Sequence, residues 1–314
     1  MRGIAVVVVL STCLATEAFA QAPPVGPLLL IIPATPRTAA LGNAWVAGRD
    51  QDVLFYNPAQ LINARQSLDL SITRHGSEGT TTTLGSVYAG GKWSLTLGWG
   101  VQFADYSVSP AMAYPYAPDV LLSSGAAQGT SALFAVGGAI VWKNTRFGAA
   151  AKYASDRVSM PTGMPDPPAR SSITNGVFVA DIGIARPIVG GTGALSVQNL
   201  GGSSNDDGTV ITVPKQVLMG WSTTKVVGPL DVGVYSQLTL RDNWTAPAGG
   251  VEIGYSWIEG YLVSLRAGAR RPESGPEHPL TFGAALTADR LTVEYGVQFF
   301  KGGRAANGVT IRWR

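Results

Sequence analysis

The sequence predicts an all-β fold: a transmembrane antiparallel β-barrel of about fourteen strands with an N-terminal hatch segment. Three observations lead to this expectation. The chain begins with a secretory signal, it alternates apolar and polar residues with period two from Ser67 onward, and its mature part has no apolar run long enough for a membrane helix. We therefore expect a bacterial outer-membrane protein.

Residues 1–20 are typical of a signal peptide, with a positive Arg2, a short apolar run and the small-x-small site Ala18-Phe19-Ala20. A lipoprotein box at Leu10-Ser11-Thr12-Cys13 is the alternative, although threonine fits poorly at its third position. Cleavage near Ala20 removes Cys13, the only cysteine of the chain. The mature protein is then expected to lack disulfides and thiol chemistry.

Composition excludes several classes of protein. Charged residues make up 14% of the chain, well below the roughly 25% of an ordinary soluble domain. The net charge of +3 is spread without a basic run, so no nucleic-acid surface is expected. Beyond the signal, the longest apolar run is Leu28 to Ile32, far short of the roughly twenty residues of a membrane helix. Only closed strands could then cross a membrane.

The alternation places one set of side chains on each face of a strand. In the clearest segment, Trp93 to Phe103, aromatic and aliphatic residues alternate with Ser, Thr, Gly and Gln. One face suits lipid and the other suits water. The predicted strands are 66–73, 81–89, 93–103, 130–142, 145–155, 173–186, 193–199, 214–223, 230–240, 248–256, 261–271, 279–287, 291–299 and 307–313.

The connections support this count, because they alternate between longer and tight along the chain. Outer-membrane barrels have long external loops and short periplasmic turns. The stretches 104–129 and 156–172 are thus predicted to be external, and both ends of the barrel domain periplasmic. A soluble β-sandwich is the competing fold, and it would not explain aromatic residues near the strand ends. The predicted aromatic girdle consists of Trp142, Tyr153, Trp221, Tyr255, Trp257, Tyr261 and Trp313.

The expected domains are the signal peptide 1–20, a hatch or plug segment 21–65, and the barrel 66–314. The hatch segment lacks period two and contains Leu28 to Ile32 and Trp45. Such apolar content favours packing inside the barrel over hanging in the periplasm. Many inward positions of the predicted strands are Gly, Ala or Ser, which suits a narrow lumen filled by a plug.

Several motifs resemble a known family. Arg37-Thr38-Ala39-Ala40-Leu41-Gly42-Asn43-Ala44-Trp45, Phe55-Tyr56-Asn57-Pro58-Ala59 and Leu195-Ser196-Val197-Gln198-Asn199 resemble the PorV/PorQ-like proteins of the FadL superfamily of outer-membrane transporters. Two positions depart from that pattern: Gln60 replaces a usual Gly, and Arg314 follows the terminal aromatic. The resemblance implies a fourteen-stranded barrel closed by a hatch, which handles hydrophobic molecules. Members of the PorV branch are instead associated with protein secretion.

The candidate site residues fall into two groups. We interpret Asn57-Pro58 as a turn between hatch and wall, and the charges as latches, surface groups or ligand contacts. The ligand or hatch candidates are Arg37, Trp45, Asp50, Asp52, Phe55, Tyr56, Asn57 and Pro58. The predicted lumen charges are Asp69, Asp231, Glu252, Arg266, Arg270, Glu294 and Arg312.

An enzyme is the competing functional class, since some outer-membrane barrels are lipases or proteases. The two histidines, His75 and His278, lie in predicted external loops, and the sequence has no nucleophile or metal motif. A pair formed by His75 and Ser77 is the remaining catalytic candidate. We expect no enzyme activity, no cofactor and no metal.

The predicted function is transport or binding of hydrophobic small molecules, and the alternative is a secretion accessory barrel that carries exported proteins. A transporter would use hatch residues such as Trp45 and Phe55 to line a pocket. A carrier would use an aromatic external surface at Tyr106, Met112, Tyr114, Pro115 and Tyr116. The expected partners are outer-membrane lipids, the barrel-assembly machinery, and either a hydrophobic small molecule or an exported protein. A monomer that binds no nucleic acid is expected.

Overall fold

The computed structural model describes residues 27–76, 79–90, 95–108, 127–162, 169–201, 205–206, 209–210, 213–241, 244–272 and 277–314. The predicted signal peptide lies outside these residues. Within the described ranges, no helix is both long and apolar enough to cross a membrane.

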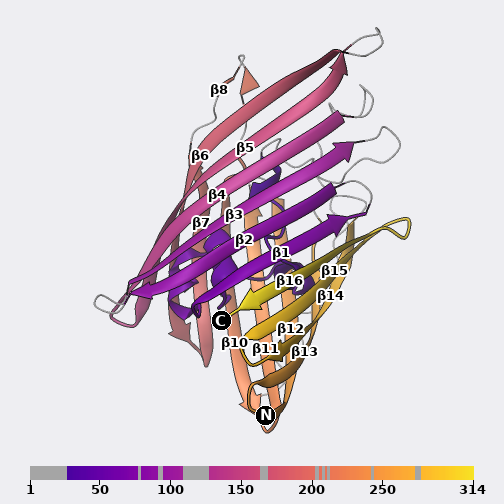
Figure 1. Ribbon diagram of the computed structural model, residues 1–314. Helices are drawn as coiled ribbons and strands as arrows, with labels where there is room; N and C mark the ends of the chain where they lie inside the picture. Colours follow the sequence, from indigo (N-terminus) through magenta and orange to yellow (C-terminus); the bar gives the residue numbers. More distant parts are fainter. Residues whose placement is uncertain are drawn as a thin grey trace.

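Fourteen strands form one closed barrel, in which each strand is antiparallel to both neighbours and β1 pairs with β16 (Figure 1). The predicted fold class and strand number are therefore confirmed. The wall strands are β1 (Ser67–His75), β2 (Gly79–Gly90), β3 (Leu95–Val108), β4 (Ala127–Trp142), β5 (Thr145–Thr162), β6 (Ala169–Ile188), β7 (Gly191–Gly201), β10 (Gln216–Val227), β11 (Leu230–Arg241), β12 (Trp244–Ile258), β13 (Tyr261–Arg270), β14 (Glu277–Ala288), β15 (Leu291–Phe300) and β16 (Ala305–Trp313).

Some strand ends were predicted wrongly. Strands β5 and β6 stay paired up to Thr162 and Ala169, so most of the stretch 156–172 is wall and not loop. This part of the chain lacks the apolar alternation that a lipid-facing strand shows. The sequence pattern therefore predicted strands that are shorter than the hydrogen-bonded strands β5 and β6. A short hairpin of β8 (Asn205–Asp206) and β9 (Thr209–Val210) lies outside the barrel sheet and was not predicted.

Tight turns gather at one end of the barrel, which we call the short-turn end. Residues 143–144, 189–190, 228–229, 259–260 and 289–290 each join two strands there. Lys143 and Asn144 have φ of 47° and 62°, as a two-residue hairpin turn requires. Strand β1 begins and β16 ends at this end. The opposite end, the loop end, carries the longest connection, residues 109–126.

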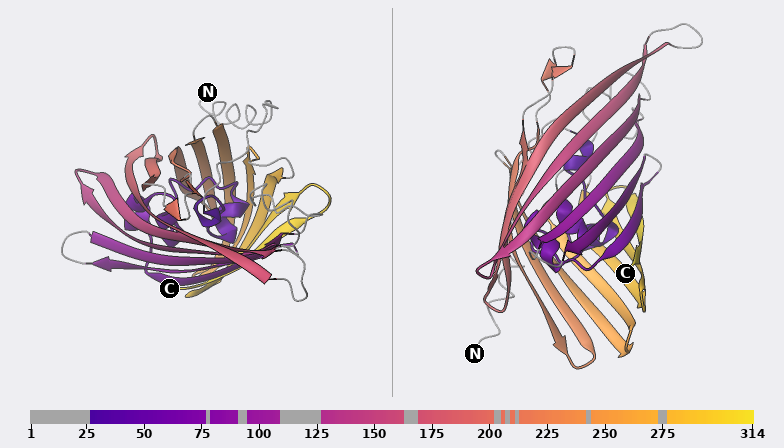
Figure 2. Two further views of the ribbon diagram at one scale, coloured as in Figure 1. Left: turned by 90° about the horizontal axis from the view of Figure 1, so that it is seen from above. Right: turned by 60° about the vertical axis from the view of Figure 1, so that its left-hand side comes forward.

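Residues 27–66, which precede β1, lie inside the barrel (Figure 2). It contains the 3-10 helices η2 (Leu28–Leu30), η3 (Gln51–Phe55) and η4 (Pro58–Asn63), and the short helix α2 (Pro36–Ala40). Thr35 caps α2 by accepting from the Thr38 backbone, and a proline occupies the first turn. Helix α2 contacts β13 to β16, whereas η4 contacts β4 to β6. The hatch segment thus touches both sides of the lumen.

Glycines on the inner wall let the hatch backbone approach closely. A Cβ at Gly183 would overlap Asn57 Oδ1, and one at Gly148 would overlap the Ala59 backbone. On the other side of the lumen, a Cβ at Gly250 would lie 2.9 Å from Leu41 Cβ. The hatch therefore packs against backbone at these points, where any larger side chain would push it away.

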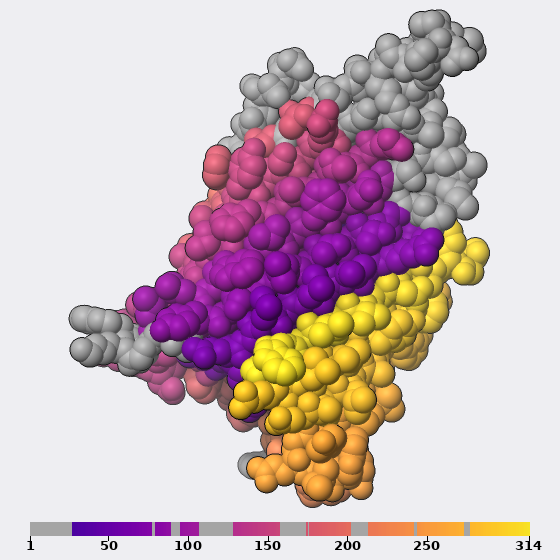
Figure 3. Space-filling view, in the orientation of Figure 1, coloured from indigo at the N-terminus to yellow at the C-terminus, as the bar shows by residue number. Residues whose placement is uncertain are grey.

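The outer face carries the apolar half of each alternation. On β1, Leu68, Leu70 and Ile72 are 50%, 41% and 49% exposed, while Asp69 and Ser71 between them are buried. Figure 3 shows that β1 to β6 and β16 make a continuous outer surface. The exposed aromatic residues Trp142, Tyr255, Trp257, Tyr261 and Trp313 lie near the short turns.

One member of the predicted girdle lies elsewhere. Tyr153 sits midway along β5, opposite Phe134, and its ring is tilted against that of Phe178 with 4.7 Å between centroids. Trp221 is half-exposed at the short-turn end, beside the β6–β7 turn. Of the predicted girdle, only Tyr153 is therefore displaced from the short-turn end.

We expect Gly183→Ala to loosen the hatch without opening the wall, because the new methyl would displace Asn57. Limited proteolysis of the folded barrel in detergent should then cut the hatch segment faster. Gly249→Ala is the matched control, since a Cβ there would meet only Tyr235 O at 3.5 Å. Equal protease resistance of the two variants would contradict the close approach at Gly183.

Candidate functional site

A buried cluster of charges joins the hatch to the wall, with Asp50 at its centre. The Asp50 carboxylate pairs with Arg37 of α2, lies 3.3 Å from Arg312 of β16, and lies 3.5 Å from Arg314. Asp50 is 7% exposed and Arg312 is 1% exposed. One hatch carboxylate thus meets guanidinium groups from the hatch, the last strand and the chain end.

The cluster continues along the inner wall through two glutamates. Glu252 of β12 accepts from Arg37 at 3.0 Å and from Arg266 of β13 at 2.6 Å. Glu294 of β15 lies 2.9 Å from Arg266 and 3.4 Å from Arg312. These ion pairs join neighbouring strands of the wall to each other. Through Arg37 they also join strands β12, β13, β15 and β16 to helix α2 of the hatch.

The remaining predicted lumen charges have different positions. Asp69 of β1 accepts from Arg312 Nε at 2.6 Å, which places a pair across the junction where the barrel closes. Arg270 of β13 pairs with Glu277 of β14 at 3.0 Å. Asp231 is half-buried on the inward register of β11, and no ion pair to it occurs among the described residues.

Asp50 and Asp52 have opposite electrostatic environments. Burial alone would raise the pKa of Asp50, but Arg312 and Arg37 outweigh it and hold that pKa below its ordinary value. Burial raises the pKa of Asp52 above its ordinary value, and the neighbouring Asp50 carboxylate raises it further. Asp52 accepts from Thr35 Oγ1 at 2.8 Å and from Trp45 Nε1 at 2.7 Å.

Trp45 anchors the hatch core and does not line the lumen pocket described below. Its side chain is fully buried, Arg37 lies over its ring at 4.8 Å, and its backbone N–H donates to Gln237 Oε1 at 3.0 Å. The ring also packs against Tyr235 with 5.1 Å between centroids. Trp45 therefore helps to hold the hatch against the wall. This role differs from the expectation that Trp45 would contact a ligand.

The Asn-Pro block forms the turn between η3 and η4. Asn57 Oδ1 accepts from the Ala59 backbone at 3.0 Å, and Pro58 begins η4. Asn57 Nδ2 donates to the carbonyls of Ile184 and Leu195, both at 3.4 Å. The side chain thus caps a helix and joins the hatch to β6 and β7.

A second network, which sequence reasoning missed, holds the carbonyls just before this turn. Gln198 of β7 donates to Phe55 O at 2.8 Å and to Tyr56 O at 2.6 Å. Gln216 of β10 donates to Gln198 Oε1 at 2.7 Å and accepts from Arg241 at 2.9 Å. Gln198 lies in the Leu195 to Asn199 motif, which was the available signal.

The same region holds a buried ion pair between Lys152 of β5 and Asp181 of β6, at 2.5 Å. Asp181 also accepts from the Asn199 backbone at 2.8 Å, where β7 bulges and Asn199 has φ 58°. Both charges stand on inward positions of apolar strands, and that placement could have marked them as lumen groups.

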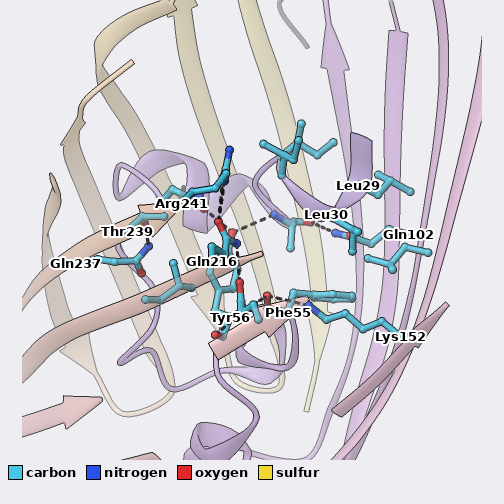
Figure 4. Close-up of a pocket in the computed structure, with 17 residues that line it drawn as sticks. Leu29, Leu30, Phe55, Tyr56, Gln102, Lys152, Gln216, Gln237, Thr239 and Arg241 are labelled. Carbon is cyan, nitrogen blue, oxygen red and sulfur yellow. Dashed lines mark hydrogen bonds between the residues drawn. The ribbon is translucent and has the colours of Figure 1, made fainter. Parts of the chain in front are cut away.

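A pocket lies between the hatch segment and the inner wall (Figure 4). Its lining is mixed, because Leu29, Leu30 and Phe55 are apolar, whereas Gln102 and Gln216 are polar. Next to it, η2 packs into an apolar cluster on the inner wall. That wall cluster consists of Ala104, Tyr106, Leu133, Ala154, Val177, Val179 and Val213.

Placement of the other candidates is mixed. Phe55 and Tyr56 line the pocket, and the Tyr56 hydroxyl donates to Asn43 Oδ1 at 2.5 Å. Tyr106 is 6% exposed and faces the lumen, so it does not belong to an external docking surface. His75 and His278 stand on strand ends of β1 and β14, not in loops. Ser77 lies outside the described residues.

The closed barrel with a chain segment in its lumen is similar in overall fold to solved barrel structures. No protein-family profile matches the sequence, and no curated protein does. The barrel is similar to the toluene transporter TbuX from Ralstonia pickettii, with a TM-score of 0.59, 13% identity, and 89% of this chain and 98% of that one covered. It is also similar to the toluene transporter TodX from P. putida, with a TM-score of 0.58, 8% identity, and 90% and 97% covered. At these identities the likeness establishes the fold.

We expect Asp50→Asn to destabilise the folded protein by about 3–5 kcal/mol, because it leaves buried guanidinium groups without their shared anion. Denaturant unfolding in detergent measures this loss. Asp231→Asn makes the same chemical change on the inward register outside the cluster, and it should have little effect. Equal stability of the two variants would show that Asp50 is not the hub.

Asp52→Asn should behave differently with pH. Because the folded pKa of Asp52 is raised, its contribution to stability is present at low pH and is lost as pH rises through the folded value. The wild type should therefore lose stability relative to Asp52→Asn as pH rises from about 4, the ordinary aspartate pKa, through the raised folded-state pKa. A constant difference in unfolding free energy across that range would contradict the raised pKa.

Proposed function

We propose that this chain resides in the bacterial outer membrane and moves a hydrophobic small molecule through its lumen, with the hatch segment as the gate. One observation carries the proposal. A pocket with both apolar and polar lining residues lies in the lumen between the hatch and the inner wall, and the hatch contacts the wall on both sides. Small-molecule sites combine apolar side chains with a few polar groups that fix the ligand's orientation.

The pocket is too small for cargo while the hatch is in its present position. Its volume is about 30 Å³, roughly that of one water molecule, whereas a benzene-sized ligand occupies a cavity of about 150 Å³. Passage therefore needs the hatch to move. The hatch residues that would have to separate first are those of η2 together with Phe55 and Tyr56, since they line the pocket.

The two networks fit a gate with one firm side and one looser side. The Asp50 cluster consists of several buried ion pairs, each costly to break singly. The opposite side is held mainly by amide side chains that donate to hatch carbonyls. Neutral hydrogen bonds contribute less than buried charge pairs. We infer that the side bearing Gln198 opens first, and that passage of cargo also requires the ion-paired side to move.

The comparisons support a transporter. TbuX and TodX are toluene transporters by description, and this chain covers nearly their whole length in the same fold. The secretion-carrier alternative gains no support from the described residues. Tyr106 of its proposed surface is buried in the lumen, and Met112 to Tyr116 lie outside the described part of the chain.

A disulfide between hatch and wall tests the gate directly. Leu41→Cys and Gly250→Cys would face each other, because a Cβ at Gly250 lies 2.9 Å from Leu41 Cβ and a small shift brings the pair to the roughly 3.5–4.5 Å that a disulfide needs. Cys13 is the only native cysteine, so no other residue of the barrel competes. Oxidation should stop uptake of a labelled aromatic hydrocarbon by whole cells, and reduction should restore it.

The single variants Leu41→Cys and Gly250→Cys are the controls, since neither can form the bridge. Both should transport equally under oxidising and reducing conditions. Undiminished uptake by the fully oxidised double variant would show that cargo does not need this side of the hatch to move. No uptake by the wild type of any apolar probe would overturn the transport proposal itself.

A further inference from the structure

A second cavity opens at the short-turn end, on the other side of the hatch from the lumen pocket. Its volume is about 670 Å³. Hatch residues form one side, and the start of β5, the β6–β7 turn and the end of β10 form the other. Its lining consists of Ala47, Arg49, Asn63, Arg65, Arg146, Pro187, Ile188, Val189, Gly190, Gly191, Thr192, Ser222, Thr223 and Thr224.

The lining contains three arginines and no acidic residue. Two of them, Arg49 and Arg65, come from the hatch segment, and Arg146 comes from β5. Three guanidinium groups around one open cavity repel each other unless an anion lies among them. Their partners within the protein therefore decide whether the cavity needs a ligand.

The three cavity arginines have distant, neutral or no side-chain partners among the described residues. Arg49 lies 3.5 Å from Glu252, but the same carboxylate is held more closely by Arg37 and Arg266. Arg146 donates to the neutral Gln60 Oε1 at 3.1 Å. Arg65 is exposed, and it has no ion pair among the described residues.

The three cavity arginines differ in their acidic partners. Arg49 reaches one carboxylate, Glu252, which Arg37 and Arg266 also hold. Arg65 and Arg146 have no ion pair among the described residues, and no carboxylate lines the cavity.

We propose that this cavity binds the oxyanion group of an amphipathic molecule. The guanidinium fork matches carboxylate and phosphate oxygens in pairs, which suits the three arginines to such a group. Pro187, Ile188 and Val189 border the same cavity, and Val189 is 91% exposed. They supply an apolar surface for the rest of the molecule. Transport of a neutral hydrocarbon would not require this site, so it stands apart from the transport proposal.

Titration calorimetry of the full-length barrel in a neutral detergent tests the site with three probes: hexyl phosphate, inorganic phosphate and hexanol. Hexyl phosphate should bind roughly tenfold tighter than inorganic phosphate, because the apolar border contacts the alkyl chain. Hexanol should bind much more weakly than either. Added salt should weaken the binding of both phosphates.

Arg65→Gln should weaken hexyl phosphate binding by roughly tenfold or more, because it removes a charge-assisted contact. Arg65 is the cleanest position, since none of the hydrogen bonds or ion pairs described here depends on it. Arg65→Lys should lose less, because the charge is kept. Lys225→Gln is the matched control, as it removes a positive charge from exposed β10 next to the cavity but outside its lining.

Several outcomes would overturn the proposal. They are the absence of hexyl phosphate binding to the wild type, equal loss in Arg65→Gln and Lys225→Gln, and equal affinity for hexanol. Equal affinity for inorganic and hexyl phosphate would overturn the amphipathic assignment. Because none of these measurements involves transport, failure of the site and failure of the transport proposal are distinguishable.

Discussion

The position of the hatch depends above all on the Asp50 carboxylate and the guanidinium groups of Arg37 and Arg312 around it. Removing a charge from water is costly unless its partners are close and well placed. Each member of this cluster is buried only because the others are present. The hatch is thereby held in one place, and the closing strands β1 and β16 are joined through Arg312 and Asp69 at the same time.

The many small residues on the inner face of the wall follow from the presence of the hatch in the lumen. A barrel with a chain segment inside has room for few large inward side chains, and glycine gives the closest approach of two backbones. Gly148 and Gly183 meet the Asn57 turn on one side, and Gly250 meets α2's end on the other. The small inward residues are therefore the counterpart of the hatch, and the apolar residues are left to face outward.

The two sides of the hatch interface differ in kind, and this difference matters for function. Ion pairs hold the side near β12 to β16, while amide groups such as Gln198 hold the side near β7. The lumen pocket borders the amide side, and the arginine-lined cavity lies beyond the hatch. A molecule that displaced the amide-held turn would pass from the lumen pocket towards a positively charged opening.

The sequence by itself determined the closed barrel, its fourteen strands, and several of the charges that face inward, because period two is a local property of each strand. Glu252, Arg266, Glu294 and Arg312 were found in this way. Only the tertiary structure decided which of them pair, since pairing depends on strand order around the barrel and on where the hatch lies. The tertiary structure also brings Lys152 and Asp181 together and buries Trp45 fully.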